Sequence, residues 1–95
     1  MTAYLIARIE ITDPQRYRDY TAETPALIAR HGGRFIVRGG APRTLEGPAE
    51  ERRLVVIEFP DRASAEAFHD DPDYAPVRAI RWEAARSELI MVDGV

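Results

Sequence analysis

Charged side chains at the ends of two apolar runs are the first candidates for chemistry in this sequence. Arg38 closes one run, and Glu58 lies near the end of another. A one-residue bulge at Gly39-Gly40 would place Arg38 opposite Glu58 in an antiparallel strand pair, with Arg8 on a neighbouring strand. Two guanidinium groups and one carboxylate leave one positive charge over, which suits an anionic or carbonyl-bearing small molecule. A structural ion pair is the alternative explanation.

A histidine at a predicted helix break is the candidate for proton transfer. His69 precedes the segment Asp70-Asp71-Pro72-Asp73-Tyr74, which interrupts a helical pattern. Imidazole changes charge near neutral pH, so we expect His69 or Glu58 to move a proton while Arg38 holds an oxyanion. The alternative is a solvated histidine held by the adjacent aspartates. His31, in the last turn of the first predicted helix, is interpreted as a capping or packing residue.

Composition excludes several other chemistries. The 13 basic residues are all arginine, so a Schiff-base lysine is excluded, and the absence of cysteine excludes disulfides and thiolate nucleophiles. A net charge of −3 gives no reason to expect a nucleic-acid partner. The two histidines lie far apart with no matching carboxylate pattern, so no metal site and no cofactor is expected. No apolar run is long enough for a membrane span, and no signal peptide is seen, so a cytoplasmic location is expected.

Hydrophobic periodicity gives the order of the elements that must position these residues. It predicts strands at residues 4–11, 34–38, 54–59 and 88–92, and helices at 14–31, 62–69 and 76–84. Asp13-Pro14 is typical of a helix start, and Gly32 of a helix end.

Three finer expectations follow from single residues. Pro25 is expected to kink the first helix. Residues 44–46 are expected to resume the second strand after the two glycines. Trp82 is interpreted as a packing residue.

The order βαββαβ predicts one α+β domain over residues 1–95 with a ferredoxin-like fold. Its four-stranded antiparallel sheet would carry the helices on one face only. Strand alternation leaves Ile6, Ile36, Leu54 and Val56 on the open face, together with Arg8, Arg34, Arg38 and Glu58. Because such an apolar face is too large for a stable monomer, we expect a homodimer that packs sheet on sheet.

Several short motifs together resemble one known family. They are Asp13-Pro14 with Tyr17 and Tyr20, residues 31–35, 38–40 and 58–60, Asp71-Pro72-Asp73-Tyr74, and residues 79–81. Over essentially the whole chain they resemble the domain-of-unknown-function family numbered 1330, DUF1330. The resemblance implies a dimeric α/β barrel, in a superfamily that includes cofactor-independent monooxygenases, lactone isomerases, haem-degrading enzymes and ligand-sensing domains.

The resemblance also implies site residues. It points to Tyr20, Arg38, Glu58 and Tyr74 as positions that face or frame a central cleft. The position of His69 resembles one that family members often fill with an aromatic residue such as tyrosine. His69 therefore either tunes this member, or the position needs only a ring.

These observations lead to one expectation with two versions. We expect a small homodimer whose cleft, edged by Arg8, Arg38, Glu58, Tyr20 and Tyr74, takes a small carbonyl, carboxylate or phenolic compound. In one version the domain catalyses a cofactor-independent isomerisation or oxygenation, with His69, Glu58 and Arg38 as catalytic groups. In the other it is a non-catalytic ligand-binding or stress-associated domain. The residues leave both versions open.

Overall fold

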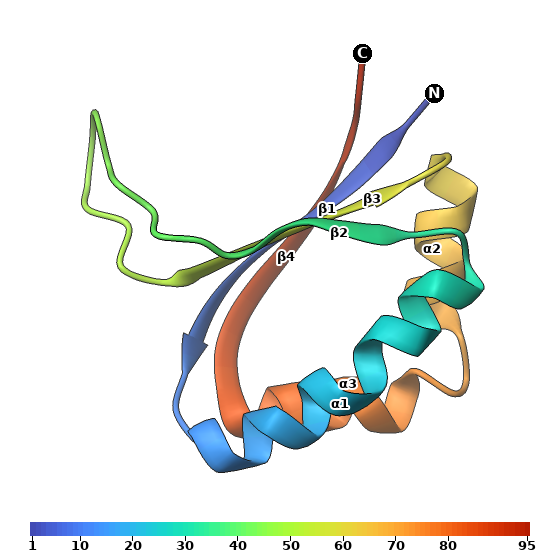
Figure 1. Cartoon of the computed structure of the whole chain (residues 1–95), viewed down its shortest axis with the longest axis horizontal. Coiled ribbons are helices and arrows are strands. Elements are labelled where there is room, and N and C mark those ends of the chain that lie inside the picture. Colours follow the sequence, from blue (N-terminus) through green and yellow to red (C-terminus); the bar gives the residue numbers. More distant parts are fainter.

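The computed structural model describes residues 1–95 as one sheet with three helices on one of its faces (Figure 1). The strand order is β2-β3-β1-β4, and every neighbouring pair is antiparallel. The predicted ferredoxin-like α+β fold is confirmed. The elements in chain order are β1 (Ala3–Ile11), α1 (Pro14–Arg30), β2 (Arg34–Gly39), β3 (Arg53–Phe59), α2 (Arg62–Asp70), α3 (Ala75–Ala84) and β4 (Ala85–Asp93).

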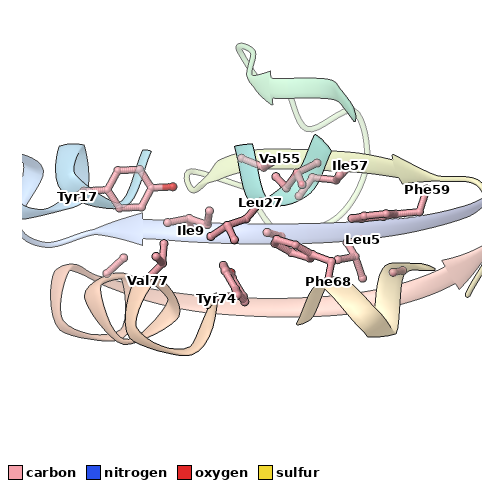
Figure 2. Packing of buried hydrophobic residues seen from close by; sticks show 14 of the residues in the cluster. Leu5, Ile9, Tyr17, Leu27, Val55, Ile57, Phe59, Phe68, Tyr74 and Val77 are labelled. Carbon is pink, nitrogen blue, oxygen red and sulfur yellow. The ribbon is translucent and has the colours of Figure 1, made fainter. Parts of the chain in front are cut away.

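The core lies between the sheet and the helices because each central strand alternates apolar side chains toward that side. Leu5, Ala7 and Ile9 of β1 are buried, and Val55, Ile57 and Phe59 of β3 are buried beside them. Figure 2 shows the labelled strand residues Leu5, Ile9, Val55, Ile57 and Phe59 packed in one cluster with Leu27 of α1 and Phe68 of α2. The same alternation sends every second residue to the open face of the sheet.

Both ends of α1 are closed as the sequence predicts. The Asp13 carboxylate accepts a hydrogen bond from the backbone N–H of Arg16 at 3.1 Å. At the other end Gly32 has φ of +76°, and the N–H of Gly33 donates to the carbonyl of Ile28, which is the Schellman pattern. The chain stays helical through Pro25.

Strand β2 contains a bulge, at a place that differs from the predicted one. Phe35 lies opposite Ile57, but Val37 lies opposite Val56, so the extra residue of the bulge is Ile36. The residues of β2 that follow Ile36 therefore point to the face opposite to the one that regular alternation would give them. Arg38 consequently lies opposite Val55, a core residue, and points to the side of the helices.

The prediction that residues 44–46 resume β2 is wrong. Gly39 and Gly40 both have positive φ, and the backbone leaves the sheet there. Residues 40–52 form a projecting arm, drawn in green to yellow-green in Figure 1. The arm is closed by the Thr44 hydroxyl, which accepts a hydrogen bond from the backbone N–H of Glu50 at 2.7 Å.

The second helical region is divided in two, as the sequence predicts. Asp61 caps α2, and Pro76 lies in the first turn of α3. The interpretation of Trp82 as a packing residue is wrong, because its side chain is exposed on α3 with the Arg78 guanidinium 5.0 Å above its ring. None of the helices is long and apolar enough to cross a membrane.

Candidate functional site

A pocket with an unbalanced positive charge lies between the sheet and helices α1 and α3. Its walls are mainly apolar and aromatic, from core residues such as Val55, Ile57 and Phe68. Its polar lining consists of three arginines, three tyrosines and two threonines, with no carboxylate and no imidazole. These are Arg38, Arg53, Arg81, Tyr17, Tyr20, Tyr74, Thr21 and Thr24. The cavity measures about 60 Å³, so it is small.

Arg81 is the most unusual of these residues because its charge is buried without a counter-charge. Its side chain is held in α3 between Val77 and Ala84 on the buried stripe of the helix, and the residue is 5% exposed. Nη1 donates to the Ser87 hydroxyl at 2.6 Å, and Nε is buried with no hydrogen-bond partner. A buried guanidinium without a carboxylate is costly to the fold.

Arg53 brings a second guanidinium to the pocket from the first position of β3. Its Nε is also buried without a hydrogen-bond partner. The guanidinium lies against Gly39, where the β-carbon of any other residue would come within 2.6 Å of Arg53 Nη1. Gly39 has φ of +89°, a conformation that favours glycine. The glycine therefore provides both the backbone turn and the space that Arg53 occupies.

Two tyrosines share a hydrogen bond on the helix side of the pocket. The Tyr20 and Tyr74 hydroxyl oxygens are 2.8 Å apart, and Tyr74 is almost fully buried. Burial raises the pKa of Tyr20 well above its ordinary value, and the neighbouring Tyr74 adds to the shift. The Tyr20 side chain therefore remains a neutral phenol near neutral pH. One hydroxyl proton joins the pair, and the other is free to be donated to a ligand.

The predicted pair of Arg38 and Glu58 is wrong. Arg34, which precedes the bulge, donates from Nε to the Glu58 carboxylate at 3.0 Å on the open face. Arg38, which follows the bulge, lies on the opposite side of the sheet with its guanidinium 4.9 Å from the Phe35 ring centre. Arg38 remains exposed and contributes to the pocket lining. The prediction failed because it placed the bulge at the glycines instead of at Ile36.

Arg8 also belongs to the open face and not to the pocket. Its Nε lies 3.2 Å from the Glu50 carboxylate. Arg52 joins the same group through Glu50 and Glu88, the latter on β4. This network connects the base of the projecting arm to β1 and β4. Because its side chains are partly exposed to solvent, it contributes little to stability.

His69 lies close to the pocket but does not line it. The side chain is 40% exposed at the end of α2, with Nδ1 3.7 Å from the Asp70 carboxylate. Its ring centre is 6.2 Å from that of Tyr74, and it lines a separate shallow hollow with Glu66 and Met91. This arrangement matches the alternative of a solvated histidine beside an aspartate.

Of the expected site residues, the structure brings Arg38, Tyr20 and Tyr74 to one pocket and leaves Arg8, Glu58 and His69 outside it. The sequence reasoning missed Arg53 and Arg81. Both carried a signal. Arg53 has the strand parity of the core residues of β3, and Arg81 has the helical spacing of Val77 and Ala84.

Asp71 organises the turn that carries Tyr74 into the pocket. Its Oδ2 lies 2.8 Å from His31 Nε2 and accepts a hydrogen bond from Arg30 Nη1 at 3.1 Å. The backbone N–H of Asp73 donates to Asp71 Oδ1, and the backbone N–H of Tyr74 donates to the backbone carbonyl of Asp71. His31, followed by the backbone N–H of Asp73 and by Arg30, holds the pKa of Asp71 below its ordinary value. The end of α1 is thereby tied to the start of α3.

The fold and the pocket define a ferredoxin-like α+β protein with a small cation-rich pocket, and comparison with known proteins gives the family. The chain belongs to the family described as a domain of unknown function, DUF1330, whose model matches residues 2–95. The predicted membership is confirmed. No match was found among the curated proteins.

Solved structures with this fold include proteins of unknown function and an oxygenase. A protein of unknown function from Rhodopseudomonas palustris, RPA0582, is 21% identical with a TM-score of 0.77, covering 99% of this chain and 82% of that one. SnoaB, a cofactor-independent oxygenase from Streptomyces nogalater, is 17% identical with a TM-score of 0.65, covering 99% and 93%. A dimeric ferredoxin-like protein of unknown function from Jannaschia is 16% identical with a TM-score of 0.69, covering 99% and 100%.

The first prediction concerns Asp71 and acid. Because its pKa is lowered from 3.8 in the folded chain, its stabilising contribution is present above that pH and is lost as the pH falls through the folded-state value. We expect Asp71→Asn to unfold at lower urea concentration than the wild type near neutral pH, and the difference to close below pH 3.8. Asp70→Asn, at an exposed neighbour, is the control and should follow the wild type throughout. A constant difference across the pH range would contradict the role of Asp71.

The second prediction concerns the cost of Arg81. Replacing an unpaired buried charge with an apolar side chain of similar length removes a desolvation penalty. We expect Arg81→Met to raise the free energy of unfolding of the ligand-free protein by about 1 kcal/mol. Arg78→Met is the control. The Nε of Arg78 is also buried without a partner, but its Nη1 donates to the His69 carbonyl and its guanidinium stacks on Trp82, so this variant should lower the free energy of unfolding by about 1 kcal/mol. Urea unfolding measures both, and a loss of stability in Arg81→Met would show that Arg81 is structural.

Proposed function

We propose that the pocket between the sheet and helices α1 and α3 binds a small anionic or carbonyl compound. The observation that carries this proposal is Arg81, a buried guanidinium that has no carboxylate partner. Arg53 adds a second cation whose Nε is buried without a partner. An anion or a polarised carbonyl oxygen in the pocket would give both guanidinium groups the negatively charged partner that the chain does not provide.

The walls and the size of the pocket restrict the ligand further. Aromatic and aliphatic side chains line most of the cavity, which suits a planar, apolar body. A cavity of about 60 Å³ is far below the roughly 300–1,000 Å³ of pockets for drug-sized ligands. The cavity is also smaller than the roughly 150 Å³ of an engineered cavity that holds benzene. A small carboxylate or phenolic compound, no larger than a single ring, therefore has to extend to the exposed Arg38 side of the pocket.

The residues that line the pocket argue against isomerisation. Oxygenation and ligand binding without catalysis are the two uses that remain. An isomerisation that shifts a proton between carbon atoms needs a base within hydrogen-bond reach, and the lining has no carboxylate or imidazole for that role. Cofactor-independent oxygenation is supported by the fold shared with SnoaB. A non-catalytic ligand-binding domain is the alternative, and consumption of oxygen in the presence of a bound ligand distinguishes the two.

We also propose that the protein is a homodimer joined through the open face of the sheet. That face exposes Ile36, Ile90 and Val92 and leaves Ile6 and Val56 half-buried, with nothing in the chain to cover them. An apolar surface of this kind is typical of an interface. The dimeric ferredoxin-like protein from Jannaschia, which has the same fold, supports a second copy as the partner.

The third prediction concerns ligand binding. Benzoate, a single-ring carboxylate, should raise the melting temperature and bind measurably by calorimetry, because it supplies the acceptor that Arg81 lacks. Arg81→Met and Arg53→Met should each weaken this binding at least about tenfold, which corresponds to about 1.4 kcal/mol. Arg62→Met, which removes an exposed guanidinium paired with Asp93, is the control and should bind benzoate as the wild type does. Equal affinities in all variants would exclude the pocket as the site.

The fourth prediction concerns assembly. Ile6 lies at the centre of the open face, beside Val56 and Ile90 on the flanking strands. Ile6→Arg should convert the dimer to a folded monomer, because a charge is tolerated in solvent and not inside an apolar interface. Light scattering coupled to gel filtration measures the mass. Glu66→Arg, on the exposed side of α2, is the control and should remain dimeric, and a wild-type protein that is already monomeric would refute the proposal.

A further inference from the structure

We propose that the pocket binds weakly acidic phenols and enols as their oxyanions, and that the ligand proton is released to the solvent on binding. The inference rests on the proposed function, and it names the ligand class of the same site. It follows from which polar groups line the pocket, and from which of them are able to accept a proton.

The polar groups that face the ligand are donors. The guanidinium groups of Arg81 and Arg53 have no acceptor role, and each has a buried Nε with no partner. The paired hydroxyls of Tyr20 and Tyr74 leave one proton free. Thr24 already donates its own proton to the Tyr20 carbonyl at 2.6 Å.

A neutral phenol does not match such a site, and a phenolate does. The hydroxyl of a neutral phenol brings one more donor into a pocket whose only side-chain acceptors are the tyrosine and threonine hydroxyl oxygens. A guanidinium N–H and the ligand O–H then compete for these few oxygens. Once the O–H bond breaks, its electron pair stays on the ligand oxygen, which becomes an acceptor only. That oxygen then accepts from Arg81 and from the tyrosine pair in surroundings where charged hydrogen bonds are strong.

The proton has no acceptor within the pocket. The titratable and charged groups that face the cavity are Tyr17 and Tyr20 of α1, Arg38 of β2, Arg53 of β3, Tyr74 at the start of α3, and Arg81 of α3; β1, α2 and β4 contribute only apolar residues to the lining. Burial raises the pKa of both Tyr17 and Tyr20, so these phenols keep their protons near neutral pH. The ligand proton therefore leaves to water or buffer at the exposed Arg38 side of the pocket.

The experiment uses 4-nitrophenol, a single-ring phenol that ionises close to neutral pH and whose phenolate absorbs visible light. The dimeric protein is titrated into the compound at a pH where the free compound is mostly neutral. We expect phenolate absorbance to appear on binding, and the phenolate to bind at least about tenfold more tightly than the phenol, a shift of about one pH unit in the ionisation of the bound compound. Calorimetry in two buffers of different ionisation enthalpy should show release of about one proton per bound ligand.

Two controls test the physical cause. 4-Nitroanisole has the same ring but no proton to lose, so it should bind at least about tenfold more weakly than 4-nitrophenol. Arg81→Met should abolish the phenolate absorbance, and Arg53→Met provides a second variant if the first does not fold. Persistence of the full spectral change in both variants would overturn the inference.

Benzoate separates failure of this inference from failure of the proposed function. If benzoate binds and requires Arg81, but 4-nitrophenol binds without a spectral change or without proton release, the pocket is an anion site that does not ionise its ligand, and the inference is overturned alone. If neither compound binds to the folded wild-type protein, both are overturned. Binding of both, with proton release confined to 4-nitrophenol, supports both.

Discussion

A single break in the alternation of the sheet determines which arginine of β2 reaches the pocket. Every strand sends successive residues to opposite faces, so one inserted residue exchanges the faces of all that follow it. In β2 that residue is Ile36. Arg34, before the bulge, stays on the open face with Glu58, whereas Arg38, after it, reaches the pocket. The two arginines are four residues apart and would share a face without the bulge.

The buried Arg81 conflicts with the folding preference of the helix that carries it. An apolar residue at position 81 would suit the stripe that Val77 and Ala84 form on α3. Instead the chain buries a guanidinium and satisfies it only in part, through Ser87 and the face of the Tyr20 ring. Sites where local folding preferences are violated without a compensating contact are those where function is expected. The pocket is therefore better explained by the proposed ligand than by its contribution to stability.

The sequence was sufficient to predict the fold because periodicity and helix caps are local signals. The spacing of Leu5, Ala7 and Ile9 and the Asp13-Pro14 start were read correctly, and the order of elements left few topologies to consider. The bulge was placed wrongly because Ile36 carries no local mark, whereas glycines, which often mark bulges, lie three residues later. That one error exchanged the face of Arg38 and removed the predicted partner of Glu58. Arg81 was missed for a different reason, since a charge on an apolar stripe is ordinarily assumed to point to solvent.

The surfaces proposed for assembly and for ligand binding lie on opposite faces of the sheet, and β3 shows how closely the two are interleaved. Arg53 and Val55 face the helices, where they line the pocket, while Leu54 and Val56 face the surface proposed for the second subunit. Backbone hydrogen bonds fix this alternation, so a side-chain change on one face leaves the other face in place. A shift of register would exchange the two sets and place guanidinium groups in the interface and apolar residues in the pocket. The register of β3 against β1 is therefore the condition for both proposed functions, and it is held by the apolar residues that β1 and β3 contribute to the common core.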